Sequence, residues 1–157
     1  MINKYLIPVY DLVYDDAFSY GDFNCRLKMQ KMVYLLQELG TSLGDYGFRW
    51  YKFGPYSQSL LDDMYASSGL PCNSISYSAD SSSNIETLHQ IMKTKTEYAS
   101  QTWAECLASI LFIKKYIMPS SASDDEILEE LVKRKPHLNQ SDTNKLALNI
   151  IKDKFNM

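Results

Sequence analysis

The residue types that most often carry enzyme chemistry are present in this sequence, but not at the spacing that the chemistry needs. His89 and His137 lie far apart, and neither has cysteines or carboxylates at metal-ligand spacing. No Ser–His–Asp or Cys–His set stands out, and the six glycines form no phosphate-binding loop. We therefore expect a protein that is not an enzyme, with no catalytic residues, no metal and no organic cofactor.

The carboxylates cluster at two places, Asp62-Asp63 and residues 124–126. Residues that are adjacent in sequence do not face each other on a helix, so these groups are badly placed for paired acid–base catalysis. We interpret both clusters as solvated helix turns.

The basic residues leave open a nucleic-acid hypothesis. Those on the expected central helix and the strand after it could form a modest groove-binding surface: Arg26, Lys28, Lys31, Arg49 and Lys52. A strand ribbon after a helix is also typical of winged-helix proteins. Against this, 19 acidic residues outnumber 16 basic ones, and the net charge is −3. A winged-helix-type DNA-binding transcriptional regulator is therefore the alternative function.

Length and composition indicate a single globular domain. The chain has 157 residues, of which 45% are hydrophobic, enough for a real core. Cys25, Cys72 and Cys106 are an odd number without a Cys-x-x-Cys pair, which favours reduced thiols. The first 16 residues are too short and too polar for a signal peptide or a membrane span. We expect a cytoplasmic protein that does not associate with a membrane.

The element around which the chain is organised is an expected helix at residues 24–39. Asn24 is a good N-cap and Gly40 a good residue for the helix end. One face carries apolar residues at intervals of three and four: Cys25, Met29, Met32, Leu36 and Leu39. The opposite face carries Leu27 and Tyr34, with Gln30 and Lys31 between them. A helix that is apolar on two faces is either central in its domain or shows one face to a partner.

Other patterns predict the rest of the fold. Alternating aromatic residues predict a strand at 48–53, ended by a Gly54-Pro55 turn and paired with a second strand at about 73–78. Residues 78–84 are expected to be a loop. Helices are expected at 3–16, from Ser57 to about residue 68, and at 85–93, 100–117, 123–136 and 141–155.

These patterns predict an α+β, mostly α fold: a helical core around a central helix with a small two-stranded β-ribbon, which leaves room for a winged-helix-like element. We divide the chain into an α-rich core domain with the ribbon, residues 1–118, and a C-terminal helical hairpin, residues 119–157, packed on the same domain.

Two blocks of sequence resemble a known family. Residues 29–37, MQKMVYLLQ, resemble the "LQKLLYLxQ" signature of the SocA-type or Panacea antitoxin domain. Residues 48–57, FRWYKFGPYS, are similar to the aromatic strand and Gly-Pro turn that follow this signature. The GPYS ending and the pattern of residues 108–138 resemble YwgA-like bacterial proteins more closely than the antitoxin branch.

This resemblance implies a non-enzymatic, α-rich protein-interaction module, either antitoxin-like or an adaptor or regulatory protein. In the antitoxin branch the partner is a toxin, sometimes delivered to a protease; for the YwgA-like branch no settled function is implied. The expected partner-binding residues are Leu27, Gln30, Lys31, Tyr34, Trp50, Gly54, Pro55 and Tyr56. The alternative is that the residues matching the motif determine the fold.

Overall fold

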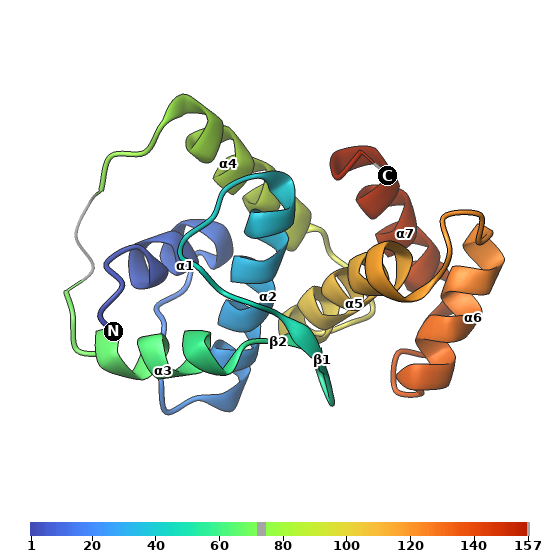
Figure 1. Cartoon of the computed structure of the whole chain (residues 1–157), viewed down its shortest axis with the longest axis horizontal. Coiled ribbons are helices and arrows are strands. Elements are labelled where there is room, and N and C mark those ends of the chain that lie inside the picture. The colour runs from blue at the N-terminus through green and yellow to red at the C-terminus, as the bar shows by residue number, and fades with distance from the viewer. Residues whose placement is uncertain (72–74, 157) are drawn as a thin grey trace.

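The computed structural model describes residues 1–71 and 75–156 and is mostly helical (Figure 1). Its helices are α1 (Leu6–Tyr14), α2 (Phe23–Leu39), α3 (Gln58–Ser67), α4 (Ala79–Lys93), α5 (Ser100–Phe112), α6 (Asp124–Arg134) and α7 (Ser141–Lys154). A π-helical turn, η1 (Ile113–Ile117), continues α5, and strands β1 (Arg49–Tyr51) and β2 (Gly54–Tyr56) lie between α2 and α3. The expected α+β, mostly α fold is confirmed.

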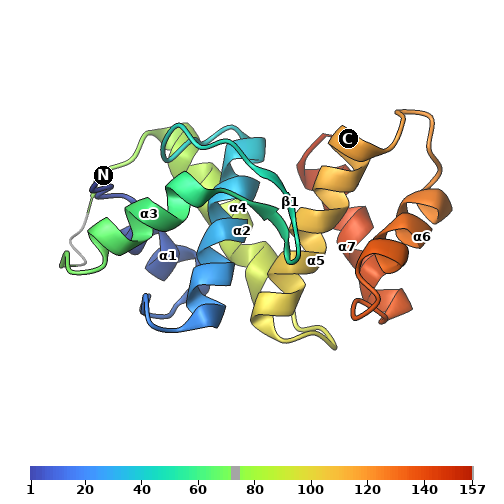
Figure 2. The same ribbon diagram turned by 60° about the horizontal axis from the view of Figure 1, so that its bottom comes forward.

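Helix α2 is wrapped by other elements along most of its length. Helices α1, α3 and α4 lie on one side of it, and α5 and the hairpin lie on the other (Figures 1 and 2). Every residue from 29 to 36 is buried. The helix begins at Asp22, whose carboxylate accepts the Asn24 N–H, so the expected Asn24 cap is wrong by two residues. It ends at Gly40, which has the left-handed φ of 111° that favours glycine, as expected.

Helix α5 connects the N-terminal helices to the C-terminal pair. It packs against α2 on one side and α7 on the other, and α6 contacts both α7 and η1 (Figure 2). The expected helix at 100–117 is present as α5 followed by η1. The expected helix at 123–136 is present as α6, and Ser123 and Glu126 form a capping box at its start. The division at residue 118 stays a prediction.

The β-ribbon is smaller and more local than expected. Strand β1 pairs antiparallel with β2, with Trp50 opposite Pro55, so Lys52 and Phe53 make a two-residue turn. The expected partner strand at 73–78 is wrong for residues 75–78, which lie outside any strand, while 72–74 lie outside the described residues. The Gly54-Pro55 turn is also wrong, because both residues belong to β2.

Residues 78–84, expected as a loop, form the start of α4. The Ser78 hydroxyl caps this helix by accepting the Ser81 N–H. Asn84 then donates to Leu39 O and Thr41 Oγ1, which ties α4 to the end of α2. Serine-rich composition misled the prediction because a serine that caps a helix and a serine in a loop look alike in sequence.

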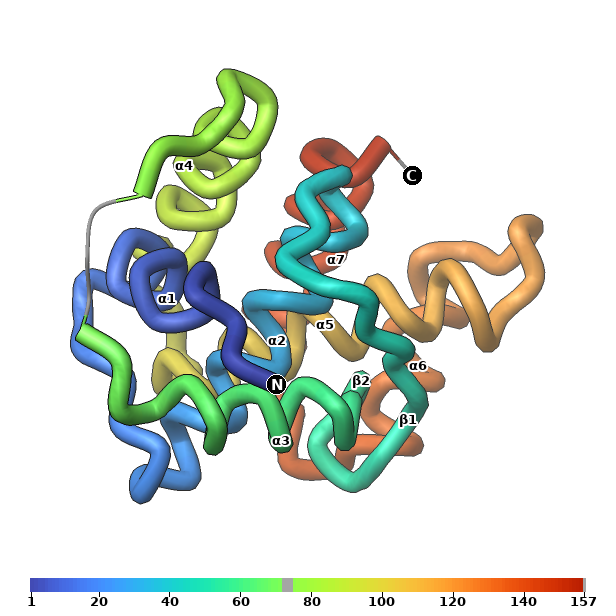
Figure 3. The backbone as a smooth tube through the Cα atoms, turned by 60° about the vertical axis from the view of Figure 1, so that its left-hand side comes forward, coloured from blue at the N-terminus to red at the C-terminus, as the bar shows by residue number. Residues whose placement is uncertain are grey.

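The two ends of the expected first helix are non-helical. Helix α1 covers Leu6–Tyr14 rather than 3–16. Ahead of it, the N-terminus lies beside α3 (Figure 3), where the Met1 amine is 2.8 Å from Asp63 Oδ1. Helix α7 begins at Ser141, where the expected helix at 141–155 also begins. Gln140 holds the N-cap position and makes no side-chain hydrogen bond there.

We predict that Leu36→Ala lowers the free energy of unfolding by about 2–5 kcal/mol, because it opens a cavity at a fully buried position of α2. Leu146→Ala is the matched control: Leu146 is 40% exposed, and we expect its loss to cost less than about 1 kcal/mol. Denaturant unfolding of both variants measures the difference. Equal midpoints would mean that α2 is not the centre of the core.

Candidate functional site

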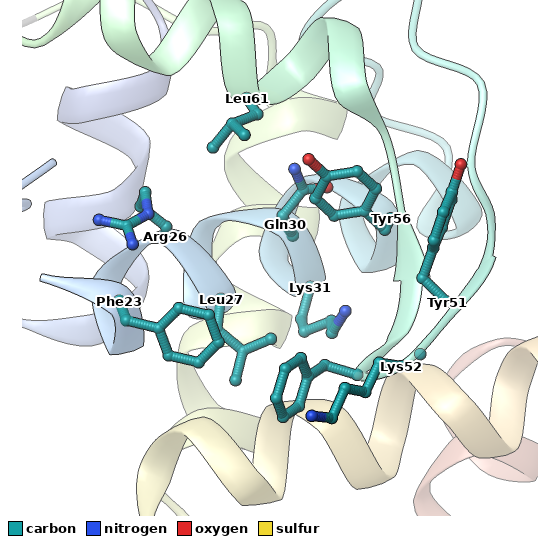
Figure 4. Close-up of a pocket in the computed structure, with 11 residues that line it drawn as sticks. Phe23, Arg26, Leu27, Gln30, Lys31, Tyr51, Lys52, Tyr56 and Leu61 are labelled. Atoms are coloured by element: carbon teal, nitrogen blue, oxygen red, sulfur yellow. The ribbon is translucent and has the colours of Figure 1, made fainter. Parts of the chain in front are cut away.

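A pocket of about 320 Å³ lies between the first half of α2, the hairpin turn and α3 (Figure 4). It is lined by aromatic and apolar side chains and by three bases: Phe23, Arg26, Leu27, Gln30, Lys31, Tyr51, Lys52, Phe53, Gly54, Tyr56 and Leu61. No carboxylate is among these lining residues. The pocket can therefore bury apolar groups beside positive charge.

Three short segments position this lining. Residues spaced by three and four on α2 share one face, which brings Phe23, Leu27 and Gln30 to the same side. The two-residue turn folds β2 back beside α2, and α3 begins directly after it. Ser57 caps α3 by accepting the Leu60 N–H, and this places Leu61 at the pocket wall.

Gln30 fixes the junction between β2 and α3. Its amide nitrogen donates to Ser57 O at 2.9 Å, and its amide oxygen accepts the Ser57 N–H at 2.9 Å. Both residues are buried, so each backbone group would lose a hydrogen bond in the absence of this side chain. Gln30 therefore has a structural role as well as a place in the pocket wall.

Lys31 lies at the floor of the pocket and is fully buried. Its Nζ donates to Pro55 O at 2.7 Å. Burial removes water from the ammonium and lowers the pKa of Lys31 to about 7, although the nearby Glu105 carboxylate acts in the opposite direction and Lys135 adds to the lowering. The charge of this lysine therefore depends on pH near neutrality.

A second lysine holds the hairpin from the opposite side. Lys135, just after α6, donates to Tyr51 O at 3.1 Å and to Lys52 O. Its Nζ is 3.6 Å from Glu105 Oε2, and burial lowers the pKa of Lys135 while Glu105 opposes that effect. Glu105 also contacts His137 Nε2 at 3.0 Å. One buried carboxylate thus stands near both lysines that bind the hairpin backbone.

Gly54 lets the hairpin approach α5 closely. Its φ is 90°, and an added Cβ would lie 2.7 Å from Ser109 Oγ. The Ser109 hydroxyl is buried and has no hydrogen-bond partner in the part of the chain that the structure describes. Glycine is therefore required here for both its backbone conformation and its size.

Five of the eight expected partner-binding residues meet at this pocket: Leu27, Gln30, Lys31, Gly54 and Tyr56. Pro55 is buried and contributes its carbonyl to Lys31. Trp50 packs on Phe112 and lies 4.9 Å from Lys135 Nζ. These two residues do not line the pocket.

The face of α2 that carries Leu27 and Tyr34 is not open to a partner along its whole length, as the expected partner-binding residues required. Tyr34, one of the expected partner-binding residues on that face, is buried against Phe48 and Phe112. The cause is that β2 and α5 cover this side of the helix, so only its first half borders the pocket.

Six lining residues were not among the expected partner-binding residues: Phe23, Arg26, Tyr51, Lys52, Phe53 and Leu61. Two of these, Arg26 and Lys52, belonged to the basic surface of the nucleic-acid alternative. A signal existed for two of them, because Phe23 and Arg26 lie one helical turn before Leu27 and Gln30 on the same face. The buried charged residues were not predicted either. Glu105 stands out as one acid inside an otherwise apolar stretch of α5, but nothing in the sequence pairs it with Lys135.

The basic residues proposed for a groove do not all reach the surface. Lys31 is buried, and Lys28 lies over the Tyr14 ring at 4.6 Å with only 11% of its side chain exposed. Arg49 is exposed but does not line the pocket. The five bases therefore do not form one open basic surface.

The remaining sequence features give no further site. Across residues 1–71 and 75–156, no three His, Cys, Asp or Glu side chains come together as a metal ion would need. Cys25 and Cys106 are buried free thiols, and Cys72 lies outside the described residues. No helix in the described part of the chain has both the length and the apolar character needed to cross a membrane.

No known protein identifies the chain. No family model matches it, and neither the curated proteins nor the solved structures include a match. The resemblance to YwgA-like proteins and to the Panacea antitoxin domain therefore stays a prediction.

We predict that the free energy of unfolding of the wild-type protein, relative to that of Lys31→Met, rises between pH 7 and pH 9. Below pH 7 the lysine is protonated in both the folded and the unfolded chain. Between the folded pKa of about 7 and the ordinary value of 10.5, the unfolded chain binds more protons, so the free energy of unfolding increases with pH. The slope is at most about 1.4 kcal/mol per pH unit.

Urea unfolding of wild type and Lys31→Met at pH 7, 8 and 9 measures this difference. Other titrating groups are common to both proteins and cancel. A difference that stays constant across this range would show that Lys31 keeps its proton in the fold.

We predict that Gly54→Ala destabilises the fold by about 1–3 kcal/mol, because alanine is strained at positive φ and its Cβ meets Ser109. Gly47→Ala is the control, since an added Cβ there meets no atom within 4 Å. Thermal unfolding compares the two variants. If both shift the midpoint equally, the close approach of β2 to α5 is not required.

Proposed function

We propose that the protein is a non-enzymatic interaction module that binds a protein partner through the face around the pocket. The observation that carries this proposal is the set of aromatic side chains left accessible around an apolar pocket. Large apolar groups are normally buried, and an exposed cluster of them is typical of a binding surface.

The aromatic groups at the rim of the pocket form two pairs. Phe23 and Phe53 meet edge to face, with ring centroids 5.3 Å apart, and Tyr51 and Tyr56 do so at 4.9 Å. Tyr51 is 51% exposed. Aromatic residues are enriched at the energetic centre of protein interfaces, because they bury much area with little loss of side-chain freedom.

Arginine adds a polar element to this rim. The Arg26 guanidinium lies 5.4 Å from the Tyr20 ring centroid and 5.7 Å from that of Phe23, and it donates to Tyr20 O. These contacts hold a long side chain in place before any partner arrives, which reduces the entropy cost of binding. Arginine beside aromatic rings is a frequent composition of interface hot spots.

The finer proposal is an antitoxin-like or adaptor role in the cytoplasm, with a toxin or a client of a protease as the partner. The similarity of residues 29–37 and 48–57 to the antitoxin signature supports this role. Burial of Tyr34 limits the proposal, because this matching residue supports the fold beneath the face, whereas Lys31, also buried, borders the pocket at its floor.

We predict that Tyr51→Ala weakens binding of the partner by about 2 kcal/mol or more, as loss of an interface hot-spot residue does. Tyr116→Ala is the matched control, because Tyr116 is 55% exposed but lies on η1, outside the lining of the pocket. Wild type and both variants are used to isolate a partner from the native host. Affinity for the purified partner is then measured by calorimetry.

The proposal requires that wild type and Tyr116→Ala retain the same stoichiometric protein and that Tyr51→Ala loses it. If Tyr51→Ala retains the protein as well as the control does, the partner binds elsewhere. If wild type instead retains duplex DNA with a steep salt dependence and no protein, the winged-helix alternative replaces this proposal.

A further inference from the structure

The charged residues that line the pocket are all basic. Arg26, Lys31 and Lys52 line it, and no acidic residue does. The two acids adjacent to lining residues in the sequence keep their charge but are hydrogen-bonded to neighbours on their own helices: the Asp22 carboxylate accepts the Asn24 N–H, and Asp62 accepts from Gln58. An occupant with a negative charge would therefore meet three bases with no acid among the lining residues to oppose it.

The floor of the pocket has unused donors. A lysine ammonium carries three N–H groups, and Lys31 uses one of them for Pro55 O. No other hydrogen bond from Lys31 is present in residues 1–71 and 75–156. A buried ammonium with unmet donors favours an oxygen ligand that brings both negative charge and acceptors.

The size of the pocket limits what can enter. At about 320 Å³ it is at the lower end of the roughly 300–1,000 Å³ typical of small-ligand sites. Its walls are formed by the Phe23, Phe53 and Tyr56 rings together with Leu27 and Leu61. One apolar side chain with a nearby charged group fits these dimensions, whereas a long segment would have to lie outside.

Resting on the protein-binding function proposed above, we propose that the pocket receives the carboxyl-terminal residue of the partner chain. The last side chain is apolar and lies between the aromatic walls, and the terminal carboxylate lies between Lys31 and Lys52. Arg26, whose guanidinium donates to Tyr20 O at the other edge of the pocket, adds positive charge at longer range.

A chain terminus fits better than an acidic side chain for a geometric reason. In a terminal residue the carboxylate and the side chain are attached to the same Cα, so both enter one small pocket together. An internal aspartate or glutamate carries its charge on its only side chain, so the apolar group between the walls would have to come from another residue. Capture of a terminal carboxylate by donors at the end of a groove is a recurrent mode of peptide recognition.

The charges around Lys31 make this binding depend on pH. Glu105 on α5 and Lys135 after α6 act on its ammonium from behind, His137 contacts Glu105, and Arg26 and Lys52 share the pocket. A carboxylate bound beside Lys31 favours the protonated lysine, so binding takes up a proton when the free lysine has lost one. Affinity should then fall as pH rises from 7 to 9.

The test uses the full-length protein and fluorescein-labelled peptides, read by fluorescence anisotropy. Each peptide has a Gly-Ser spacer and one of the twenty amino acids at its end, prepared once as the free acid and once as the amide. We expect the acids that end in apolar residues to bind, and their amides to bind at least tenfold more weakly. Lys52→Ala should weaken acid binding at least threefold, whereas Lys145→Ala, an exposed lysine on α7, should not change it.

A second measurement isolates Lys31. Binding of the tightest acid is measured at pH 7, 8 and 9 for wild type and Lys31→Met, and circular dichroism checks that the variant is folded. We expect wild-type affinity to fall severalfold across this range and the variant to bind weakly at every pH. Equal pH dependence in the two proteins would overturn the role of Lys31.

The remaining outcomes separate this inference from the proposed function. If no acid binds more tightly than its amide, the carboxylate site is refuted. If phenylacetate displaces the peptides at equal concentration, the occupant is a small acid and not a chain end. If a purified partner keeps its affinity after its carboxyl end is extended by Gly-Ser-Gly, the terminal site is refuted while the protein-binding function stands. If terminal acids bind but Tyr51→Ala retains the partner, the carboxylate site stands, while the proposal that the partner binds through the face around the pocket is refuted.

Discussion

The hairpin of this protein is held in place by polar side chains that are themselves buried. Gln30 binds both backbone groups of Ser57, and Lys31 binds the carbonyl of Pro55. These contacts are needed because every residue of α2 from 29 to 36 is buried, so a polar group there must find a partner within the protein. The contact of β2 with α5 and the start of α3 both depend on the position that these two side chains give to β2.

The pocket is a consequence of the same arrangement. Polar side chains attach β2 to α2 beyond the first turns of the helix, so the two-residue turn at Lys52 and Phe53 stands over the beginning of α2 with space beneath it. Aromatic rings from both elements border this space, and the fully buried Lys31 closes its floor. A rigid attachment below and an accessible rim above are the features that a binding surface requires.

The parts of the fold with a local cause were predictable from sequence. Apolar residues at intervals of three and four located the helices, and Ser123 with Glu126 located the start of α6, because these signals act within a few residues. The hairpin partner was missed because the Lys52-Phe53 turn has none of the glycine or asparagine typical of tight turns.

Much of the pocket depends on distant contacts, and these were not predictable. Burial of Lys31 runs against the tendency of lysine to be exposed, and only the tertiary structure brings it close to Glu105. The residues of the antitoxin-like signature located the right region of the chain, yet they left open whether they act on a partner or on the fold.

The two lysines also set an order for assembly of the chain. Lys31 lies in an early helix, but Lys135, which binds the Tyr51 and Lys52 carbonyls, is made more than eighty residues after them. Until synthesis has passed Lys135, the Tyr51 and Lys52 carbonyls lack the ammonium that donates to them, and Glu105 lacks the lysine that lies beside it. A nascent chain that has released only its first helices therefore has no finished rim, and the binding face is completed only after α6 and Lys135 have emerged.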